Sequence, residues 1–318
     1  MGFDLEELRS SVAAHGRVVR VVIADLRGSS PREVGAAMLV WESGQSGTIG
    51  GGTLEFEAAK AARAQTAATV LSRHALGPDM GQCCGGAVTL LSEVYDAEKA
   101  ADLPESGVIA RPAAEDAPAD MPLAVKRLAS YARGQGQAPE PQLIDGWMVE
   151  PVHQRETHLW IWGAGHVGRA LVDVLSPLPD LAITWVDTGP ERFPEDIPAH
   201  VTPLPAADPA LLVKHAPADA QHLILTYSHN LDLALCHALL SRGFTFAGLI
   251  GSATKWARFR SRLKGLGHSP EQIAQITCPI GDPSLGKHPQ MIAVGVAAAL
   301  LQNQAITTSS EQREGKRA

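Results

Sequence analysis

Cysteine, aromatic side chains and long apolar runs are all scarce in this chain. Four cysteines in 318 residues are too few for a disulfide framework. Lys and Arg number 27 against 34 Asp and Glu, and the formal net charge of −7 argues against nucleic acid or an anionic membrane as a general partner. No apolar run approaches the roughly 20 residues that a membrane span needs. We therefore expect a cytoplasmic globular protein that binds neither nucleic acid nor membrane.

The remaining composition is ordinary for a soluble α/β protein. Hydrophobic residues make up 45% of the chain and charged residues 19%. The length favours about two domains. The first residues, MGFDLEELRSSVAAHG, predict an acidic amphipathic helix and not a signal peptide.

One stretch in the second half, residues 158–187, has the clearest pattern. The apolar run LWIW leads into a GxGxxG string at Gly163, Gly165 and Gly168, then a helical pattern, then a second apolar run that ends on Asp187. In this strand–turn–helix–strand context the glycines allow a tight turn, close approach of a pyrophosphate and close helix packing. His166, inside the loop, is predicted to face the ligand or to narrow the site. The alternative is a strand–helix unit that uses its glycines only for packing.

The second half continues as alternating strands and helices. The predicted strands, which imply a parallel Rossmann-like sheet with helices on both faces, are residues 159–162, 182–186, 200–204, 222–226 and 245–250. Two loops follow the later strands. Because open α/β sheets bind ligands at the carboxyl ends of strands, these loops supply candidate binding residues, namely Ser228, His229, Gly251, Ser252 and Lys255. Lys255 could reach a phosphate.

The first half predicts a smaller α/β domain. Strands are expected near residues 17–25, 36–41 and 87–94, with an alanine-rich helix from the GGGTLE string to about Arg73. Consecutive glycines at a helix start can form a nest of N–H groups for an anion, so Gly50, Gly51 and Gly52 are candidate phosphate ligands. A tight turn between packed elements explains them equally well.

The string GQCCGG carries the least ordinary local feature. Cys83 and Cys84 are adjacent, which is not the spacing of a zinc knuckle. A glycine-rich loop can present a thiol to a ligand, and thiolate suits metals that prefer sulfur. The alternative is a pair of half-buried structural residues. Cys236, on a predicted apolar helix face, is expected to be buried.

These patterns predict four segments. Residues 1–103 form the first domain, residues 104–155 a proline-rich linking region, residues 156–302 the Rossmann-like domain, and residues 303–318 a disordered tail. A hairpin is expected inside the linking region across Asp145-Gly146, which favours a type I′ turn.

The strings GSSPR, GGGTLE and GQCCGG in the first half, with LWIWGAGHVGRAL, TYSHNLDLALCHALL, IGSATKWARFRSRL and CPIGDPSLGKHPQMIAVGVAAALL in the second, resemble in order the XdhC/CoxI family of molybdenum-cofactor accessory proteins. This resemblance covers nearly the whole chain. It implies a chaperone, not an enzyme, that binds and protects molybdopterin-type cofactor. Such proteins support its sulfuration by a cysteine desulfurase and insert it into an apo-hydroxylase, here xanthine dehydrogenase or a relative of the carbon monoxide dehydrogenase type.

The implied partners are the molybdenum subunit of xanthine dehydrogenase, a cysteine desulfurase and proteins of molybdenum cofactor biosynthesis; a homodimer is also expected. The family's cysteine motif falls on Cys83 and Cys84, the implied metal contacts, and the choice between them stays open. Thr53 stands where many relatives have cysteine. The predicted cofactor-binding residues are Cys83, Cys84, Gly50, Gly51, Gly52, Gly163, Gly165, His166, Gly168, Asp187, Ser228, His229, Gly251, Ser252 and Lys255.

Two other functions compete with the chaperone. One is an NAD(P)-dependent oxidoreductase with nucleotide at Gly163 to Asp187 and an acid–base pair of His229 and Asp232. The other is a scaffold that links desulfurase to target enzyme without holding cofactor. For the chaperone, the motif loops of both halves are expected to bind one ligand together. NAD or another nucleotide could bind at the glycine string in any of these cases.

Overall fold

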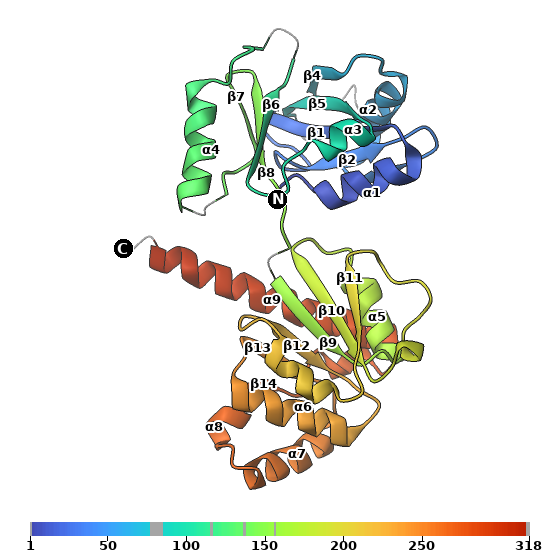
Figure 1. The fold of residues 1–318 in the computed structure, drawn as a ribbon, viewed down its shortest axis with the longest axis vertical. Coiled ribbons are helices and arrows are strands. Elements are labelled where there is room, and N and C mark those ends of the chain that lie inside the picture. Colours follow the sequence, from blue (N-terminus) through green and yellow to red (C-terminus); the bar gives the residue numbers. More distant parts are fainter. Residues whose placement is uncertain (1, 77–84, 115–116, 136–137, 156, 316–318) are drawn as a thin grey trace. The chain divides into compact units, whose positions relative to one another are not determined.

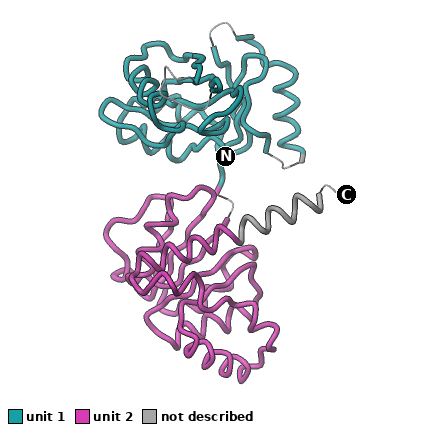
Figure 2. The backbone as a smooth tube through the Cα atoms, turned by 180° about the vertical axis from the view of Figure 1, so that it is seen from behind, with its two compact units in different colours: residues 1–154 teal, residues 155–318 magenta. Residues whose placement is uncertain are grey.

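The computed structural model describes residues 2–76, 85–114, 117–135, 138–155 and 157–315. The chain divides into two compact units, residues 1–154 and residues 155–318, drawn in teal and magenta in Figure 2. Each unit has its own sheets and its own core.

The first unit contains two antiparallel sheets. Its helices and strands are α1(Leu5–His15), β1(Val18–Arg27), β2(Ala37–Val40), β3(Gln45–Gly47), α2(Gly52–Ala64), β4(Thr69–Ala75), β5(Ala87–Tyr95), α3(Ala97–Ala101), β6(Val108–Pro112), α4(Leu123–Gln135), β7(Gln142–Ile144) and β8(Trp147–Pro151). The larger sheet has the order β3-β2-β1-β5-β4, and the smaller has the order β6-β8-β7 (Figure 1).

Side-chain alternation along β1 explains how these layers stack. Val19, Val21 and Ile23 lie in one core cluster with the apolar face of α2. Val22, on the opposite face, packs with Met148 of β8, so the smaller sheet covers that side. The outer face of the smaller sheet packs against α4 through Val125. The unit is therefore a stack of α2, larger sheet, smaller sheet and α4.

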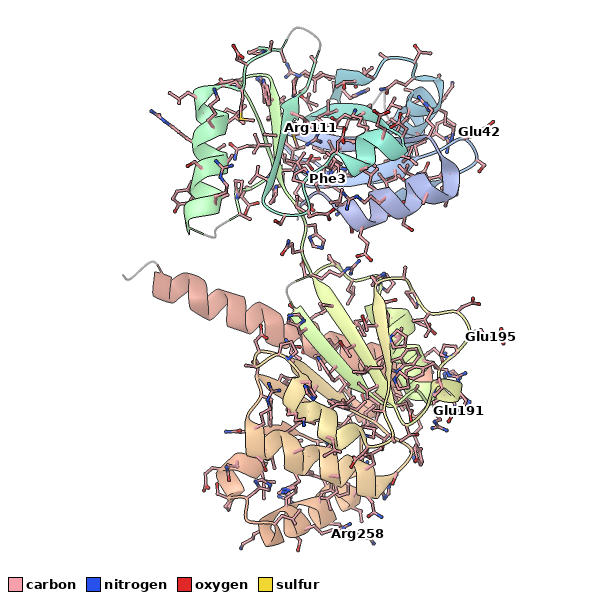
Figure 3. The ribbon with its side chains drawn as sticks, viewed as in Figure 1. Phe3, Glu42, Arg111, Glu191, Glu195 and Arg258 are labelled. Carbon is pink, nitrogen blue, oxygen red and sulfur yellow. The ribbon has the colours of Figure 1, made fainter. Side chains whose placement is uncertain are left out.

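A buried ion cluster joins the two sheets. Arg20 of β1 donates hydrogen bonds of 2.7 and 3.0 Å to Glu150 of β8. Arg111 of β6 bridges Glu150 at 2.6 Å and Glu93 of β5 at 2.7 Å. Both guanidinium groups lie over the ring of Phe3, which Figure 3 shows beside Arg111. Each buried charge thus has an opposite partner, as burial requires.

Two predictions for the first unit were wrong. The helix expected to reach about Arg73 ends at Ala64, and residues 69–75 form edge strand β4 instead. Residues 69–75 pair with β5 at the edge of the larger sheet, and this tertiary pairing overrides the helical pattern of the sequence. Residues 104–155 were expected to be a linking region, but this stretch contains β6, α4, β7 and β8, and residues 104–154 belong to the first unit. The hairpin is confirmed: β7 pairs with β8, and Asp145 and Gly146 have φ of 49° and 78°.

The second unit is a Rossmann-like domain, which confirms the predicted α/β fold. Its elements are β9(Thr157–Trp162), α5(His166–Leu175), β10(Leu181–Asp187), η2(Pro190–Arg192), β11(Val201–Pro205), η3(Pro209–His215), β12(Gln221–Ile224), α6(His229–Arg242), β13(Phe246–Leu249), α7(Ala253–Gly265), α8(Pro270–Ile273), β14(Ile276–Thr277), η4(Pro283–Leu285) and α9(Pro289–Gly315). The six strands are parallel in the order β11-β10-β9-β12-β13-β14. Every strand predicted from the sequence is present.

Alternating residues of β9 bury both faces of this sheet. Leu159 and Ile161 pack with α5 and α9, whereas Trp160 and Trp162 pack with α6 and α7. The strand order reverses between β9 and β12, so the loops that follow these two strands diverge at the switch point (Figure 1).

The last helix differs from the prediction. A disordered tail was expected from residue 303, but α9 continues to Gly315. The sequence between Gly295 and Gly315 contains neither glycine nor proline, so no helix stop signal occurs before Gly315. Among the described residues, no helix is both long enough and apolar enough to cross a membrane.

Candidate functional site

Three motif loops of the first unit meet at one end of the larger sheet. A Cβ placed on Gly50 would lie 2.6 Å from Cγ of Pro31, so the GGGTLE loop contacts the GSSPR loop. Ser29 forms a parallel bridge with Gly85, and a Cβ on Gly86 would lie 2.2 Å from the Ser29 carbonyl oxygen. We call residues 28–32, 50–55 and 85–86 the motif-loop cluster.

The glycine nest in this cluster already holds an anion from the chain itself. Glu55 accepts hydrogen bonds of 3.0 Å from the backbone N–H groups of both Ile49 and Gly51, and one of 2.5 Å from the hydroxyl of Thr48. Partial burial alone would raise the pKa of Glu55, but these hydrogen bonds outweigh it and the pKa is lowered. Of the three predicted glycines, Gly51 donates to this carboxylate and Gly50 donates to the Thr48 hydroxyl, so phosphate binding at the three glycines stays a prediction. A phosphate at Gly50–Gly52 would have to bind beside Glu55 or displace it.

The cysteines separate into two groups. Cys83 and Cys84, the predicted metal contacts, lie outside the described residues, and Gly85 is the first described residue after them. Cys236 is buried, as predicted, and burial raises the pKa of its thiol. Burial also raises the pKa of Cys278 to about 11, so this thiol is protonated at neutral pH. Within the described ranges no group of three or more His, Cys, Asp or Glu side chains could hold a metal ion.

In the second unit, the predicted glycines occupy the loop between β9 and α5. A Cβ on Gly163 would lie 2.5 Å from the Leu225 carbonyl oxygen, and one on Gly168 would lie 2.0 Å from the Gly163 oxygen. These two glycines therefore allow close packing of strand and helix. Gly165 has open space around its Cβ position and caps α5 without a side-chain hydrogen bond. The first N–H groups of α5 thus remain available to an anion.

Asp187 lies beside this loop with both carboxylate oxygens engaged. It accepts 2.6 Å hydrogen bonds from the backbone N–H groups of Ala164 and Thr188. Arg192 approaches the same carboxylate at 3.4 Å and lies over the ring of Tyr227. Asp187 is almost fully buried, so its first role in the structure is to hold the glycine loop. A ribose would have to share these oxygens, and ribose binding by Asp187 stays a prediction.

Lys255 and Asp232 form a buried ion pair. The Lys255 Nζ donates to Asp232 at 2.6 Å and to the Ile250 carbonyl oxygen at 2.9 Å. Asp232 also accepts from the backbone N–H of Thr226 at 2.9 Å. This pair joins the loops that follow β12 and β13. Within the chain, Asp232 therefore balances the charge of Lys255. Phosphate binding by Lys255 and acid–base chemistry of Asp232 with His229 stay predictions.

The remaining predicted residues lie at the starts of helices. Ser228 and Ser252 accept hydrogen bonds from the N–H groups of Leu231 and Lys255, respectively, so both hydroxyls cap helices. His166 is exposed at the first position of α5. His229 is exposed at the start of α6 and contacts the ring of Phe259 edge-on. Together with Gly163–Gly168 and Gly251, these residues follow β9, β12 and β13, and we call this group the strand-end site.

Sequence reasoning missed the residues that fix these loops. No role was predicted for the side chains of Glu55, Arg192 or Thr226. Glu55 is an acidic residue in the first turn of α2, and this is a local signal that could have identified the carboxylate that fills the nest. Arg192 lies five positions after its ion-pair partner Asp187, but its contact with Tyr227, 35 positions away, has no local signal in the sequence.

Comparison with known proteins matches both units. Residues 159–300 match the XdhC Rossmann domain, and residues 11–73 match the XdhC and CoxI family. Together these matches span more than half of the chain. The chain belongs to the XdhC and CoxI family.

One curated protein and one solved structure are among those similar to this chain. YqeB of Escherichia coli, an uncharacterised protein, is 30% identical over 156 residues, which are 48% of this chain and 28% of YqeB. The chain therefore aligns with little more than a quarter of that curated relative. A crystal structure of a xanthine dehydrogenase from Bacillus halodurans is 20% identical, with a TM-score of 0.65 over 94% of this chain and 95% of that one. This likeness confirms the fold.

Proposed function

We propose that this protein is an accessory protein of xanthine dehydrogenase that carries molybdenum cofactor as cargo. In this role it holds and protects the cofactor, supports its sulfuration by a cysteine desulfurase, and delivers it to the apo-enzyme in the cytoplasm. Family membership supports the accessory role. The observation that carries the proposal is the motif-loop cluster, where three strings far apart in the sequence come together in one unit.

The chemistry of the cluster suits this cargo. The hydroxyl oxygen of Ser30, in the GSSPR loop, is buried and has no hydrogen-bond partner in the described part of the chain. An unsatisfied buried hydroxyl is costly, and a bound polar group would satisfy it. Gly85 and Gly86 tie the end of the GQCCGG loop to the same place. We infer that Cys83 or Cys84 contacts the metal centre from this loop, since a thiolate is a soft ligand.

The strand-end site supplies a second set of donors. We propose that the free N–H groups at the start of α5 bind a phosphate or pyrophosphate of the cargo or of a separate nucleotide such as NAD. The carboxylate of Asp187 should disfavour a 2′-phosphate. NAD should therefore bind more tightly than NADP in a fluorescence titration. The reverse order would contradict this assignment and would indicate that Arg192, which stands beside that carboxylate, binds the 2′-phosphate instead.

The proposal is tested by measuring whether the purified protein carries the cofactor. The full chain is purified without oxygen from a molybdenum-replete host, and its pterin and molybdenum contents are measured. We expect both to co-purify in about equal amounts. The protein is then mixed with apo-xanthine dehydrogenase, whose activity should rise only if the accessory chain carried cofactor.

Substitutions at the thiols make the test specific. Replacing both Cys83 and Cys84 with Ala should abolish metal retention with no change in the circular dichroism spectrum. Cys278→Ala is the matched control, because its thiol belongs to the second unit and is protonated. Full cofactor retention by the double variant would refute the role of the two thiols. Absence of pterin from the unaltered protein, with normal stimulation of the target enzyme, would instead favour the scaffold without cargo.

A further inference from the structure

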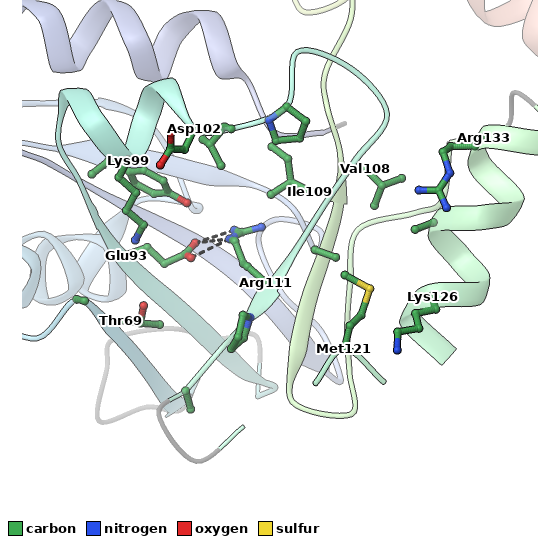
Figure 4. Close-up of a pocket in the computed structure, with 18 residues that line it drawn as sticks. Thr69, Glu93, Lys99, Asp102, Val108, Ile109, Arg111, Met121, Lys126 and Arg133 are labelled. Atoms are coloured by element: carbon green, nitrogen blue, oxygen red, sulfur yellow. Dashed lines mark hydrogen bonds and ion pairs between the residues drawn. The ribbon is translucent and has the colours of Figure 1, made fainter. Parts of the chain in front are cut away.

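The first unit contains a pocket of about 630 Å³ that the motif loops do not line. It lies between α4 and the larger sheet and follows strand β6 along its length (Figure 4). Every residue from Val108 to Pro112 lines it. Its volume is in the range of ordinary binding pockets.

Strand β6 presents a free backbone edge to this pocket. It is the outer strand of the smaller sheet, and within the described part of the first unit no strand pairs with its other side. The N–H of Val152 donates to the Gly107 oxygen at 2.8 Å, and the N–H of Ala113 donates to the Gly146 oxygen at 2.9 Å. Backbone groups alternate along an antiparallel strand. The N–H and C=O groups of Val108 and Ala110 therefore point away from β8, toward the open edge.

The layers on either side leave room for one more strand. Val108 and Ala110 pack against the cluster under α4, whereas Ile109 packs with residues of the larger sheet. A strand added beside β6 would therefore lie between α4 and the larger sheet, as β6 itself does. That position is the pocket. Unpaired edges of this kind are templates for pairing with another chain.

The pocket is positively charged, although the chain as a whole has a net charge of −7. Lys126 and Arg133 line it from α4, and Lys99 lines it from α3 (Figure 4). The charge of Arg111 is balanced by its carboxylate partners in the buried cluster. Asp102 is the other acidic side chain among the residues that line the pocket. The excess of positive charge selects an acidic occupant.

We propose that the open edge of β6 binds an extended, acidic segment of a partner protein, which adds a fourth strand to the smaller sheet. The outward N–H and C=O groups of Val108 and Ala110 would pair with the backbone of this segment. Pro112 has no N–H, so it sets the end of the paired stretch. Acidic side chains at every second position of the segment would face Lys126 and Arg133. This inference goes beyond the proposed function and does not depend on it.

The test uses a fluorescein-labelled peptide with the repeat Glu-Val, about eight residues long, and the full-length protein. Fluorescence polarisation measures binding at low and at moderate salt, and hydrogen exchange follows individual backbone amides. We expect saturable binding that weakens as salt rises, with slower exchange at Val108 and Ala110. A Lys-Val peptide of the same length should bind at least tenfold more weakly.

Two variants separate strand addition from simple charge attraction. The double variant K126E/R133E should weaken binding of the Glu-Val peptide at least tenfold, whereas R127E, on the same helix but outside the pocket lining, should not. Ala110→Pro removes one outward N–H and should weaken binding without loss of the β8 pairing. Unchanged binding by K126E/R133E would overturn the proposal. So would full competition by free glutamate, or peptide binding without protection of the β6 amides.

Discussion

The buried carboxylate of Asp187 should be essential to the shape of the glycine loop, and its replacement by Asn tests this directly. All groups that contact the carboxylate are donors: the N–H groups of Ala164 and Thr188, the Thr188 hydroxyl and the guanidinium of Arg192. A carboxylate accepts from all of them, whereas an amide has one accepting oxygen and one donating nitrogen. Whichever way Asn is oriented, its NH₂ group faces a backbone donor that was 2.6 Å from oxygen.

The expected loss follows from burial. Asp187 is 3% exposed and Ala164 is 1% exposed, so water cannot replace the lost acceptor at the Ala164 N–H. An unsatisfied buried donor costs about 1–3 kcal/mol, and the lost hydrogen bond to a charged acceptor adds to this. We expect Asp187→Asn to lower the free energy of unfolding of the second unit by about 2–3 kcal/mol. Asp187→Ala, which removes both acceptors, should lower it by more.

Urea denaturation followed by tryptophan fluorescence measures the effect, since Trp160, Trp162 and Trp185 are buried in the second unit. Asp173→Asn on α5 is the matched control, because Asp173 is exposed and should change stability by less than about 0.5 kcal/mol. Anion binding at the loop should weaken in Asp187→Asn but not in the control. A stability of Asp187→Asn equal to that of the control would refute the role of this carboxylate.

Three further predictions concern buried polar groups. Burial, with a smaller contribution from Arg242, lowers the pKa of His222 from 6.5 to about 4. As pH falls, His222 therefore binds a proton in the unfolded chain before it does so in the folded protein. The free energy of unfolding should decrease from pH 6.5 toward about 4, by up to about 3 kcal/mol. In urea titrations, His222→Gln should remove this part of the pH dependence of stability. Glu150→Gln should destabilise the first unit by about 3–5 kcal/mol in the same assay, because Arg20 loses its buried counter-charge; a change below 1 kcal/mol would contradict this. Tyr95→Phe should raise the melting temperature slightly, because the buried Tyr95 hydroxyl has no hydrogen-bond partner among the described residues. A clear destabilisation would indicate that this hydroxyl is satisfied in solution.

Local patterns in the sequence were sufficient for the Rossmann-like unit. Strands β9 and β13 are short apolar runs followed by glycine loops, and helices α5, α6 and α7 each bury an apolar face against the sheet. The hairpin at Asp145-Gly146 was equally predictable, because its turn requires positive φ at both residues. These features depend on neighbours in the sequence, and the sequence alone therefore determined them.

Tertiary structure decided the features that depend on distant partners. The Arg20–Glu150 contact joins residues 130 positions apart, so nothing near Arg20 announces that β8 will cover it. The segment 69–75 is a strand because it pairs with β5. Residues 104–155 fold because they pack on an apolar face of the larger sheet. The same reason applies at the candidate sites. The glycines could be found from the sequence. That the carboxylates of Glu55, Asp187 and Asp232 accept hydrogen bonds from the nearby donors became clear only from the packing that buries them. Burial decides which polar groups must pair within the chain and which remain open to a ligand.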